Sequence, residues 1–145
     1  MMPKKKIKAG IIGASGIAGY ELTKLLINHP NVAIVLLNSE THAGKKIKDV
    51  YSDFDFGNNK LQYGDNKYED NQLQYTNLLA DINKINSLNL DIVFFCGKHT
   101  KAMELVPKLS AKIIDFSADY RFKDLAEYER VYGVKHKDRI NAEKA

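Results

Sequence analysis

Three glycines, spaced three residues apart, have the types and spacing of a phosphate-binding turn. They form the stretch GASGIAG, at Gly13, Gly16 and Gly19. The first permits a tight turn, the second leaves the backbone open to a phosphate, and the third lets a helix pack closely on a sheet. A helix starting here would present unpaired N–H groups to that phosphate. The pattern predicts dinucleotide binding; the alternatives are a purely structural turn or another nucleotide.

The segments around the turn have the matching character. Residues 7–12 are apolar and β-branched, which predicts a buried strand, and residues 32–37 predict a second one. Between them a helix should run as far as Asn28, His29 and Pro30, because proline disfavours helical geometry before it. A right-handed crossover makes the two strands parallel neighbours. The residues expected on the buried face of this helix are Ile17, Ala18, Leu22, Leu25 and Leu26.

The end of the second predicted strand bears on which dinucleotide is bound. A site for NAD usually has a carboxylate here that accepts from the ribose 2′-hydroxyl, whereas Ser39 can donate to a 2′-phosphate. Lys45 and Lys46 follow closely and either add positive charge or lie in a solvated loop. These residues favour NADP, but NAD is favoured instead if Glu40 points inward.

Strands and helices continue to alternate along the chain. Two further buried strands are predicted at 91–96 and 112–116, with helical segments in 78–88, 100–110 and 125–132. Pro107 predicts a kink or two short helices in 100–110. The polar stretch 49–76 predicts short strands and loops. We therefore expect an α/β fold, a Rossmann-like, doubly wound, mostly parallel sheet forming one NAD(P)-binding domain over residues 1–145.

Composition excludes several other classes of protein. The 145 residues are 44% hydrophobic and 28% charged, and no apolar run has the length of a membrane span. The net charge of +4 comes from 22 basic and 18 interspersed acidic residues, without the basic stripe of a nucleic-acid-binding protein. One cysteine cannot form an intramolecular disulfide, and no secretory signal is evident. We expect a cytoplasmic protein with no nucleic-acid, membrane or metal partner.

Two stretches carry a resemblance to a known family. HPNVAIVLLNSETHAGK follows the first helix, and IDFSADYRFKDLAEYERVYGVKH spans Ile114 to His136. Together with GASGIAG they resemble N-acetyl-gamma-glutamyl-phosphate reductases, and SADYR followed by the Tyr132–Gly133 pair is the most specific part. Aspartate-semialdehyde dehydrogenases share the glycine turn but lack SADYR in this form. A dehydrogenase of that type and a non-catalytic dinucleotide-binding module remain the alternatives.

The resemblance implies an enzyme of arginine biosynthesis. Members reduce N-acetylglutamyl phosphate to the semialdehyde with NADPH, and are expected to be homo-oligomers. A cysteine thiolate attacks the acyl phosphate, phosphate leaves, and hydride from the cofactor reduces the thioester.

The resemblance places the nucleophile outside this chain. In the family the nucleophilic cysteine lies beyond the SADYR segment, in the substrate domain, so we expect it beyond Ala145 and expect no catalytic residue within the chain. Cys96, at the end of an apolar strand, is interpreted as a small core residue.

The resemblance also implies roles for particular residues. Ser39 would lie by the adenine ribose phosphate. The turn from Cys96 to His99 would lie along the cofactor near its nicotinamide half, and Ser117 and Ala118 would approach the nicotinamide. Arg121, at the rim of the active site with Asp119, is the candidate for binding substrate phosphate or carboxylate; the alternative is a structural ion pair with Asp119 or Asp124. The residues expected to bind the cofactor diphosphate are Gly13, Ser15, Gly16, Ile17 and Gly19.

One short motif departs from the family pattern. Members usually have Pro-His-Gly after the third strand, where this chain has Lys98, His99 and Thr100. Only the histidine matches, so the backbone shape of this loop and its contacts with a cofactor are not given by the resemblance.

Overall fold

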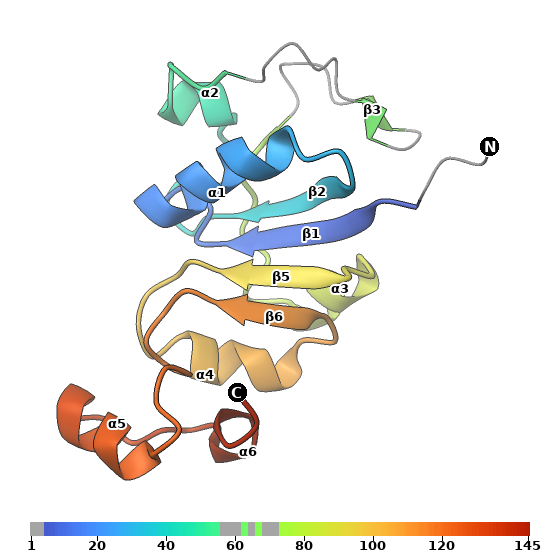
Figure 1. The fold of residues 1–145 in the computed structure, drawn as a ribbon. Coiled ribbons are helices and arrows are strands. Elements are labelled where there is room, and N and C mark those ends of the chain that lie inside the picture. The colour runs from blue at the N-terminus through green and yellow to red at the C-terminus, as the bar shows by residue number, and fades with distance from the viewer. Residues whose placement is uncertain (1–4, 56–61, 64–65, 68–72) are drawn as a thin grey trace.

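Four parallel strands form the centre of the protein, in the order β2-β1-β5-β6 (Figure 1). They are β1 (Ile7–Ile12), β2 (Val32–Asn38), β5 (Ile92–Phe95) and β6 (Lys112–Asp115). The computed structural model describes residues 5–55, 62–63, 66–67 and 73–145. Each predicted strand is present, with ends within one residue of the predicted ones, and the predicted parallel, doubly wound sheet is confirmed.

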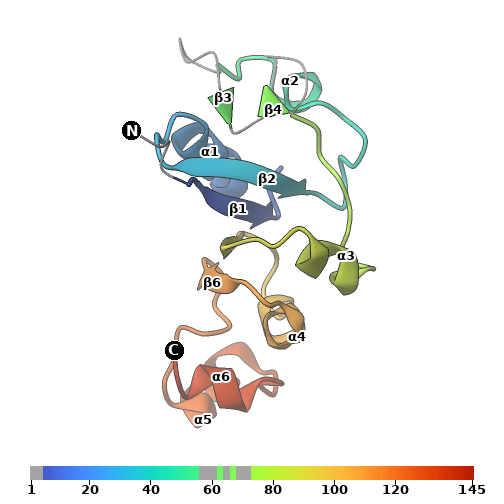
Figure 2. The ribbon, with the colours of Figure 1, turned by 90° about the vertical axis from the view of Figure 1, so that its right-hand side faces the viewer.

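Helices cover both faces of the sheet (Figures 1 and 2). On one face, α1 (Ile17–Ile27) packs on β1 and β2; on the other lie α3 (Ile82–Ser87) and α4 (Ala102–Leu105). After α4 the chain tightens into a 3₁₀ turn at Val106–Lys108, which contains Pro107. The predicted break in this helix is therefore confirmed.

Shorter elements complete the described chain. Helix α5 has the predicted ends, whereas α2 and α6, one turn each, were not predicted. Much of the polar stretch 49–76 lies outside the described residues. No helix of the described part is long and apolar enough to cross a membrane. The shorter elements are α2 (Ile47–Val50), β3 (Gln62–Tyr63), β4 (Asn66–Lys67), α5 (Leu125–Tyr132) and α6 (Arg139–Ala142).

Helix α1 packs through a different face from the predicted one. Ile17 and Leu25 are 85% and 71% exposed and Ala18 is exposed too, so the predicted apolar face was wrong at these three positions, whereas Leu26 is buried as predicted. The helix is oriented instead by Gly19, where a Cβ atom would lie 2.7 Å from Cα of Ala14. With Gly19 facing the sheet, the residues that follow it at intervals of three to four positions lie on the same side of the helix and are buried. The buried residues of α1 are Gly19, Tyr20, Thr23, Leu26 and Ile27.

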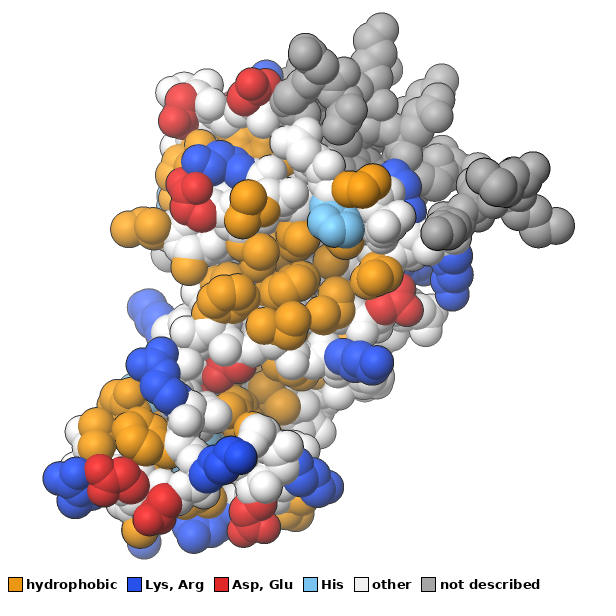
Figure 3. All heavy atoms as spheres, in the orientation of Figure 1, with side chains coloured by type: hydrophobic (Ala, Val, Ile, Leu, Met, Phe, Trp, Pro, Cys, Tyr) orange, Lys and Arg blue, Asp and Glu red, His pale blue; other side chains and the backbone are white. Residues whose placement is uncertain are grey.

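Strand β6 is less buried than its sequence predicts. Ile114 is 44% exposed and the following Phe116 is 50% exposed. The physical reason is the position of β6 at the edge of the sheet. Helix α1 covers this face of the sheet only over β1 and β2. Figure 3 shows apolar side chains gathered on the sheet face that α1 leaves open. Apolar, β-branched sequence predicted the strand, but not its place at the edge.

Candidate functional site: a groove at the carboxyl ends of the strands

A groove of about 440 Å³ opens at the carboxyl ends of β1 and β5. From β1 the chain passes to one side, through α1 to β2, and later returns to the other side for β5 and β6. Parallel α/β sheets bind ligands in the crevice where the strand order reverses in this way. The groove is lined by Ile12, Gly13, Ser15, Gly16, residues 38–42, Leu79, residues 95–98, Lys101 and Leu105.

Asn38, at the end of β2, holds the glycine turn in place. Its carbonyl oxygen accepts from the N–H groups of Gly13 and Ala14, at 3.0 and 2.9 Å. Its side-chain oxygen accepts from the N–H of Leu78 at 2.7 Å. Asn38 is buried, so all three hydrogen bonds are protected from water. One residue thus ties the glycine wall of the groove to the segment that carries Leu79.

Hydroxyl groups join the glycine turn to the end of β2. The hydroxyls of Ser15 and Ser39 lie 2.6 Å apart, and Ser39 also accepts the N–H of His42 at 3.0 Å. Tyr51 donates to the carbonyl oxygen of Ser15 at 2.6 Å. Ser39 is therefore both a structural residue, 2% exposed, and part of the groove lining.

The N-terminus of α1 faces this groove without a side-chain cap. Its N-cap residue is Gly16, where a Cβ atom would meet only the carbonyl oxygen of Gly13, at 3.5 Å. The first N–H groups of a helix have no partner within the helix. Open space and unpaired donors at a helix start are what a phosphate requires. This end of the groove therefore fits the diphosphate of a dinucleotide.

The side of the groove formed by β5 carries a thiol whose pKa is raised by its surroundings. Cys96 is half-buried, and burial raises the pKa of its thiol to about 11, with the charge of Asp115 adding to the rise. Burial likewise raises the pKa of Asp115, although Ser117 counters this by donating its N–H and its hydroxyl at 2.8 Å each. The interpretation of Cys96 as a packing residue is consistent with these surroundings.

The loop that follows β5 is held from behind by Asp119. This carboxylate is fully buried and accepts from the N–H groups of Thr100 and Met103, at 2.9 and 3.0 Å. The Tyr128 hydroxyl of α5 also donates to it, at 3.1 Å. Asp119 thus joins the SADYR segment, α5 and the start of α4 into one unit.

Comparison with known proteins identifies this architecture. Residues 8–145 match the family described as semialdehyde dehydrogenase, NAD binding domain. The chain belongs to this family.

Curated proteins are similar to this chain over nearly its whole length. An N-acetyl-gamma-glutamyl-phosphate reductase of Methanosarcina barkeri is 40% identical over 94% of the chain, and one of Acinetobacter baylyi is 34% identical over 90%. A protein of Arabidopsis thaliana named as a probable chloroplastic reductase of the same type is 32% identical over 93%. The chain spans 36%, 33% and 30% of the lengths of these relatives.

A solved structure shares the fold of this semialdehyde dehydrogenase domain. The crystal structure of an aspartate semialdehyde dehydrogenase with NADP from Candida albicans aligns with a TM-score of 0.59. It covers 92% of this chain and 41% of that one, at 19% sequence identity. The predicted resemblance to N-acetyl-gamma-glutamyl-phosphate reductases is confirmed by the curated relatives, and the predicted fold is confirmed by this structure.

The residues predicted to bind the cofactor do not all line the groove. Gly13, Ser15, Gly16 and Ser39 line it. The others lie outside the lining set: Ile17 is exposed on α1, Gly19 packs on the turn, and His99 and Ser117 lie in the loops behind.

His99 turns away from the groove. Its Nδ1 atom lies 2.9 Å from Oδ1 of Asp119, without hydrogen-bond alignment, and its ring packs on Tyr132 at 4.5 Å between centroids. Within the described residues, no three histidine, cysteine or acidic side chains gather as a metal site.

Arg121 is exposed, and its guanidinium makes no ion pair with the described residues. The structural alternative was an ion pair with Asp119 or Asp124. Within the described residues, both carboxylates instead accept hydrogen bonds from other groups. Asp124 caps α5 by accepting the N–H groups of Ala126 and Glu127. Arg121 is thus left available to a ligand.

Sequence reasoning missed several lining residues, among them Thr41, His42, Leu79 and Lys101. The signal for Thr41 and His42 was their place directly after β2, beside Ser39. Leu79 follows a long polar stretch, and hydrogen bonds of Thr76 and Leu78 to the end of β2 bring it to the groove.

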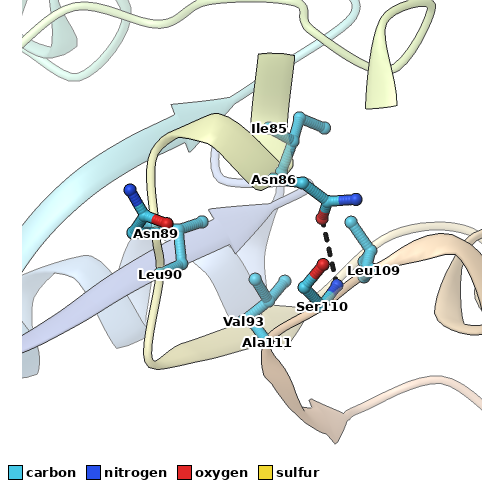
Figure 4. A pocket seen from close by; sticks show the side chains of 8 residues that line it. All are labelled: Ile85, Asn86, Asn89, Leu90, Val93, Leu109, Ser110 and Ala111. Atoms are coloured by element: carbon cyan, nitrogen blue, oxygen red, sulfur yellow. Dashed lines mark hydrogen bonds between the residues drawn. The ribbon is translucent and has the colours of Figure 1, made fainter. Parts of the chain in front are cut away.

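A second cavity, of about 280 Å³, lies at the opposite end of the sheet (Figure 4). Its base is apolar, with Ile85, Val93 and Leu109. The Asn86 side chain donates to the carbonyl of Lys108 and accepts from the N–H of Ser110, both at 3.0 Å. These bonds join α3 to the start of β6 and leave the amide few free groups with which to bind a ligand.

A third cavity, of about 400 Å³, lies beside the edge strand β6. Ala145 lines it together with Asp115 and Tyr120, so the residues after α6 return to the sheet. Ala145 is also the residue beyond which the nucleophilic cysteine is expected, and that expectation stays a prediction. Among the described residues the sole thiol is that of Cys96, whose raised pKa does not suit a nucleophile.

Proposed function

We propose that this chain is the NADP(H)-binding domain of an N-acetyl-gamma-glutamyl-phosphate reductase. The observation that carries the proposal is the groove at the reversal point of the sheet, where the uncapped start of α1 and Gly16 leave room for a diphosphate. The identity to curated reductases over nearly the whole chain supports the reaction class. The aspartate-semialdehyde alternative has the support of a shared fold alone.

The proposed reaction of the whole enzyme is reduction of an acyl phosphate to an aldehyde. NADPH supplies the hydride, which reduces a thioester formed when a thiolate displaces phosphate. The share of this chain is to hold and orient the dinucleotide. Its cysteine, Cys96, with a thiol pKa of about 11, is not the nucleophile of this scheme, which we place beyond Ala145.

The choice of NADP over NAD depends on the end of β2. Ser39, Thr41 and His42 offer hydroxyl and ring groups that suit a 2′-phosphate. Glu40 also lines the groove, and a carboxylate here suits the free ribose hydroxyl of NAD instead. NAD is accordingly the second candidate, and binding measurements decide between the two.

Other predicted residues enter as part of this proposal. Ile17 and Gly19 would contribute the backbone at the start of α1, and His99 and Ser117 would act near the nicotinamide. Arg121 would bind the substrate phosphate or carboxylate through its exposed guanidinium.

We also propose that the whole enzyme is a cytoplasmic homo-oligomer with a small-molecule acyl phosphate as its partner. The exposed apolar residues Ile114 and Phe116 on the edge strand β6 support association. The location follows from the resemblance to a biosynthetic reductase. Size-exclusion chromatography with light scattering measures the oligomeric state.

Calorimetric titration with NADPH and with NADH, at one fixed salt concentration, tests the function. The matched variant is Gly16→Leu, because the position opens toward the groove and the new side chain has few protein atoms to strike. Circular dichroism and urea unfolding establish that the variant is folded. We expect saturable binding with a preference for NADPH, lost in Gly16→Leu.

Each other result has a defined meaning. A preference for NADH would replace NADP by NAD and assign the discrimination to Glu40, which Glu40→Ser would then reverse. Failure of the folded wild-type chain to bind either dinucleotide would overturn the proposal.

A further inference from the structure

The loop between β5 and α4 brings two lysines to the groove. Lys98 and Lys101 both line it, together with the glycine turn. A dinucleotide carries several negative charges, so positive groups on this wall would act directly on its affinity. The family resemblance places the turn of residues 96–99 along the cofactor but gives no role to either lysine side chain, and at Lys98 the chain departs from the usual proline.

The two lysines differ in whether an acidic side chain already pairs with them. Lys101 lies 3.5 Å from Glu104, and Glu104 in turn pairs with Lys137 at 2.6 Å. Lys98 is exposed and has no ion pair within the described residues. The opposing charge on the groove lining is Glu40, at the end of β2. Lys98 is therefore the cation on this wall that is free to meet a ligand.

The position of Lys98 in the fold indicates which phosphate it would meet. A Cβ atom on Gly13 would lie 2.6 Å from the carbonyl oxygen of Cys96 and 2.8 Å from the nitrogen of Gly97. The chain leaving β5 thus runs directly against the glycine turn, and Lys98 is the next residue. The end of β2, with Ser39 and His42, lies on the other side of β1. Lys98 is placed beside the diphosphate position rather than beside the ribose 2′-phosphate.

The loop is held at both sides of Lys98. Before it, Gly97 packs against the ring of Phe95, where a Cβ atom would lie 2.7 Å from Cζ. After it, the N–H of Thr100 donates to Asp119, and the ring of His99 packs on Tyr132. A cation on a fixed loop loses less conformational freedom on binding than one on a mobile segment.

We propose that Lys98 binds the diphosphate of the dinucleotide, as an affinity determinant common to NADPH and NADH. This assignment rests on the proposed function of the groove. It names a contact with the part of the ligand that the two dinucleotides share.

Calorimetry on three variants, each titrated with NADPH and NADH, tests the assignment. Lys98→Ala should weaken binding about tenfold for both dinucleotides, and Lys98→Glu should weaken it further. Lys98→Arg should retain most of the affinity, because it keeps the charge. Lys112→Ala is the matched control: it makes the same change in charge at the start of β6, at the other end of the strands.

The outcomes separate this assignment from the proposed function. The assignment would be supported if Lys98→Ala lost equal affinity for both dinucleotides while Lys112→Ala lost none. A loss confined to NADPH would overturn it in favour of a 2′-phosphate contact, and unchanged affinities would show that the side chain does not reach the ligand. A wild-type chain that binds neither dinucleotide would overturn the proposed function, and this assignment with it.

Discussion

The two ends of the parallel sheet use their polar groups in opposite ways. At the amino ends, the amide of Asn86 is bonded to backbone groups on both sides, and the cavity beside it has an apolar base. At the carboxyl ends, the start of α1 has no cap and Lys98 has no ion pair within the described chain. Polar groups that already have partners stabilise the fold, whereas those left open can bind a ligand.

The same contrast exists within the glycine turn, between Gly19 and Gly16. A Cβ atom at Gly19 would lie 2.7 Å from Cα of Ala14, so Gly19→Ala should lower the free energy of unfolding by about 3 kcal/mol. Gly16→Ala meets one atom at 3.5 Å and should change stability by less than about 1 kcal/mol. Urea unfolding measures both. Equal losses would contradict the distinction between a packing and a binding glycine.

Substitutions of Asp119 and Asn86 compare how much polar side chains at the two ends of the sheet contribute to stability. Asp119→Asn replaces a buried acceptor of three hydrogen bonds, and should lower the free energy of unfolding by about 2–4 kcal/mol. Asn86→Ala, at a half-buried site, should lower it by about 1–2 kcal/mol.

The Asp119 and Asn86 variants should also differ in their affinity for the dinucleotide. In the folded proteins, Asp119→Asn should weaken binding, because Asp119 holds the loop that presents Lys98, whereas Asn86→Ala should not. A variant at Asn86 with weakened binding would contradict the division between the two ends of the sheet.

Thr100 shows strain on the functional side that substitution can relieve. Its φ angle is +73°, a left-handed conformation that β-branched residues strongly disfavour. Thr100→Gly removes this strain, and the gain should exceed the cost of the freedom that glycine adds to the unfolded chain. The free energy of unfolding should therefore rise by about 0.5–1 kcal/mol. Thermal and urea unfolding measure the change, with Thr100→Ala expected to lie between the two. A less stable glycine variant would show that the Thr100 side chain stabilises the loop.

The framework of the fold was predictable because its signals are local. Apolar, β-branched runs predicted all four strands of the main sheet, and Pro107 predicted the break after α4. The buried face of α1 was not predictable from hydrophobicity, since it holds the small residue Gly19 and the polar Thr23, whose hydroxyl donates to the carbonyl oxygen of Gly19. The exposure of β6 depends on which half of the sheet α1 covers, and the spacing of apolar residues in the sequence does not indicate which half that is.

The candidate site was predictable in part, for a related reason. Gly13, Gly16 and Ser39 follow directly from strand ends, where parallel topology brings residues together. Asp119 was expected at the rim of the site, but it is buried behind the loop, because its partners Thr100 and Tyr128 are distant in sequence. Lys98 was visible only as a departure from a family pattern.

The reactivity of Cys96 tests whether the functional end of the sheet offers binding without a nucleophile. Burial, with the charge of Asp115 added, raises the pKa of this thiol to about 11. Alkylation by iodoacetamide should therefore be slow at neutral pH, rise about tenfold per pH unit, and level off near pH 11. Asp115→Asn should move the curve to lower pH, and the urea-unfolded chain provides the ordinary thiol as a control.

The same shift links Cys96 to stability. Because the folded chain holds the thiol proton more tightly than the unfolded chain, the stabilisation is fully present below the ordinary thiol pKa and is lost as the pH rises toward 11. Unfolding free energies should therefore fall over this range in the wild type, and fall less in Cys96→Ala. A thiol that reacts rapidly at pH 7 would instead place a nucleophile in the groove, and the division of labour proposed for this domain would have to be abandoned.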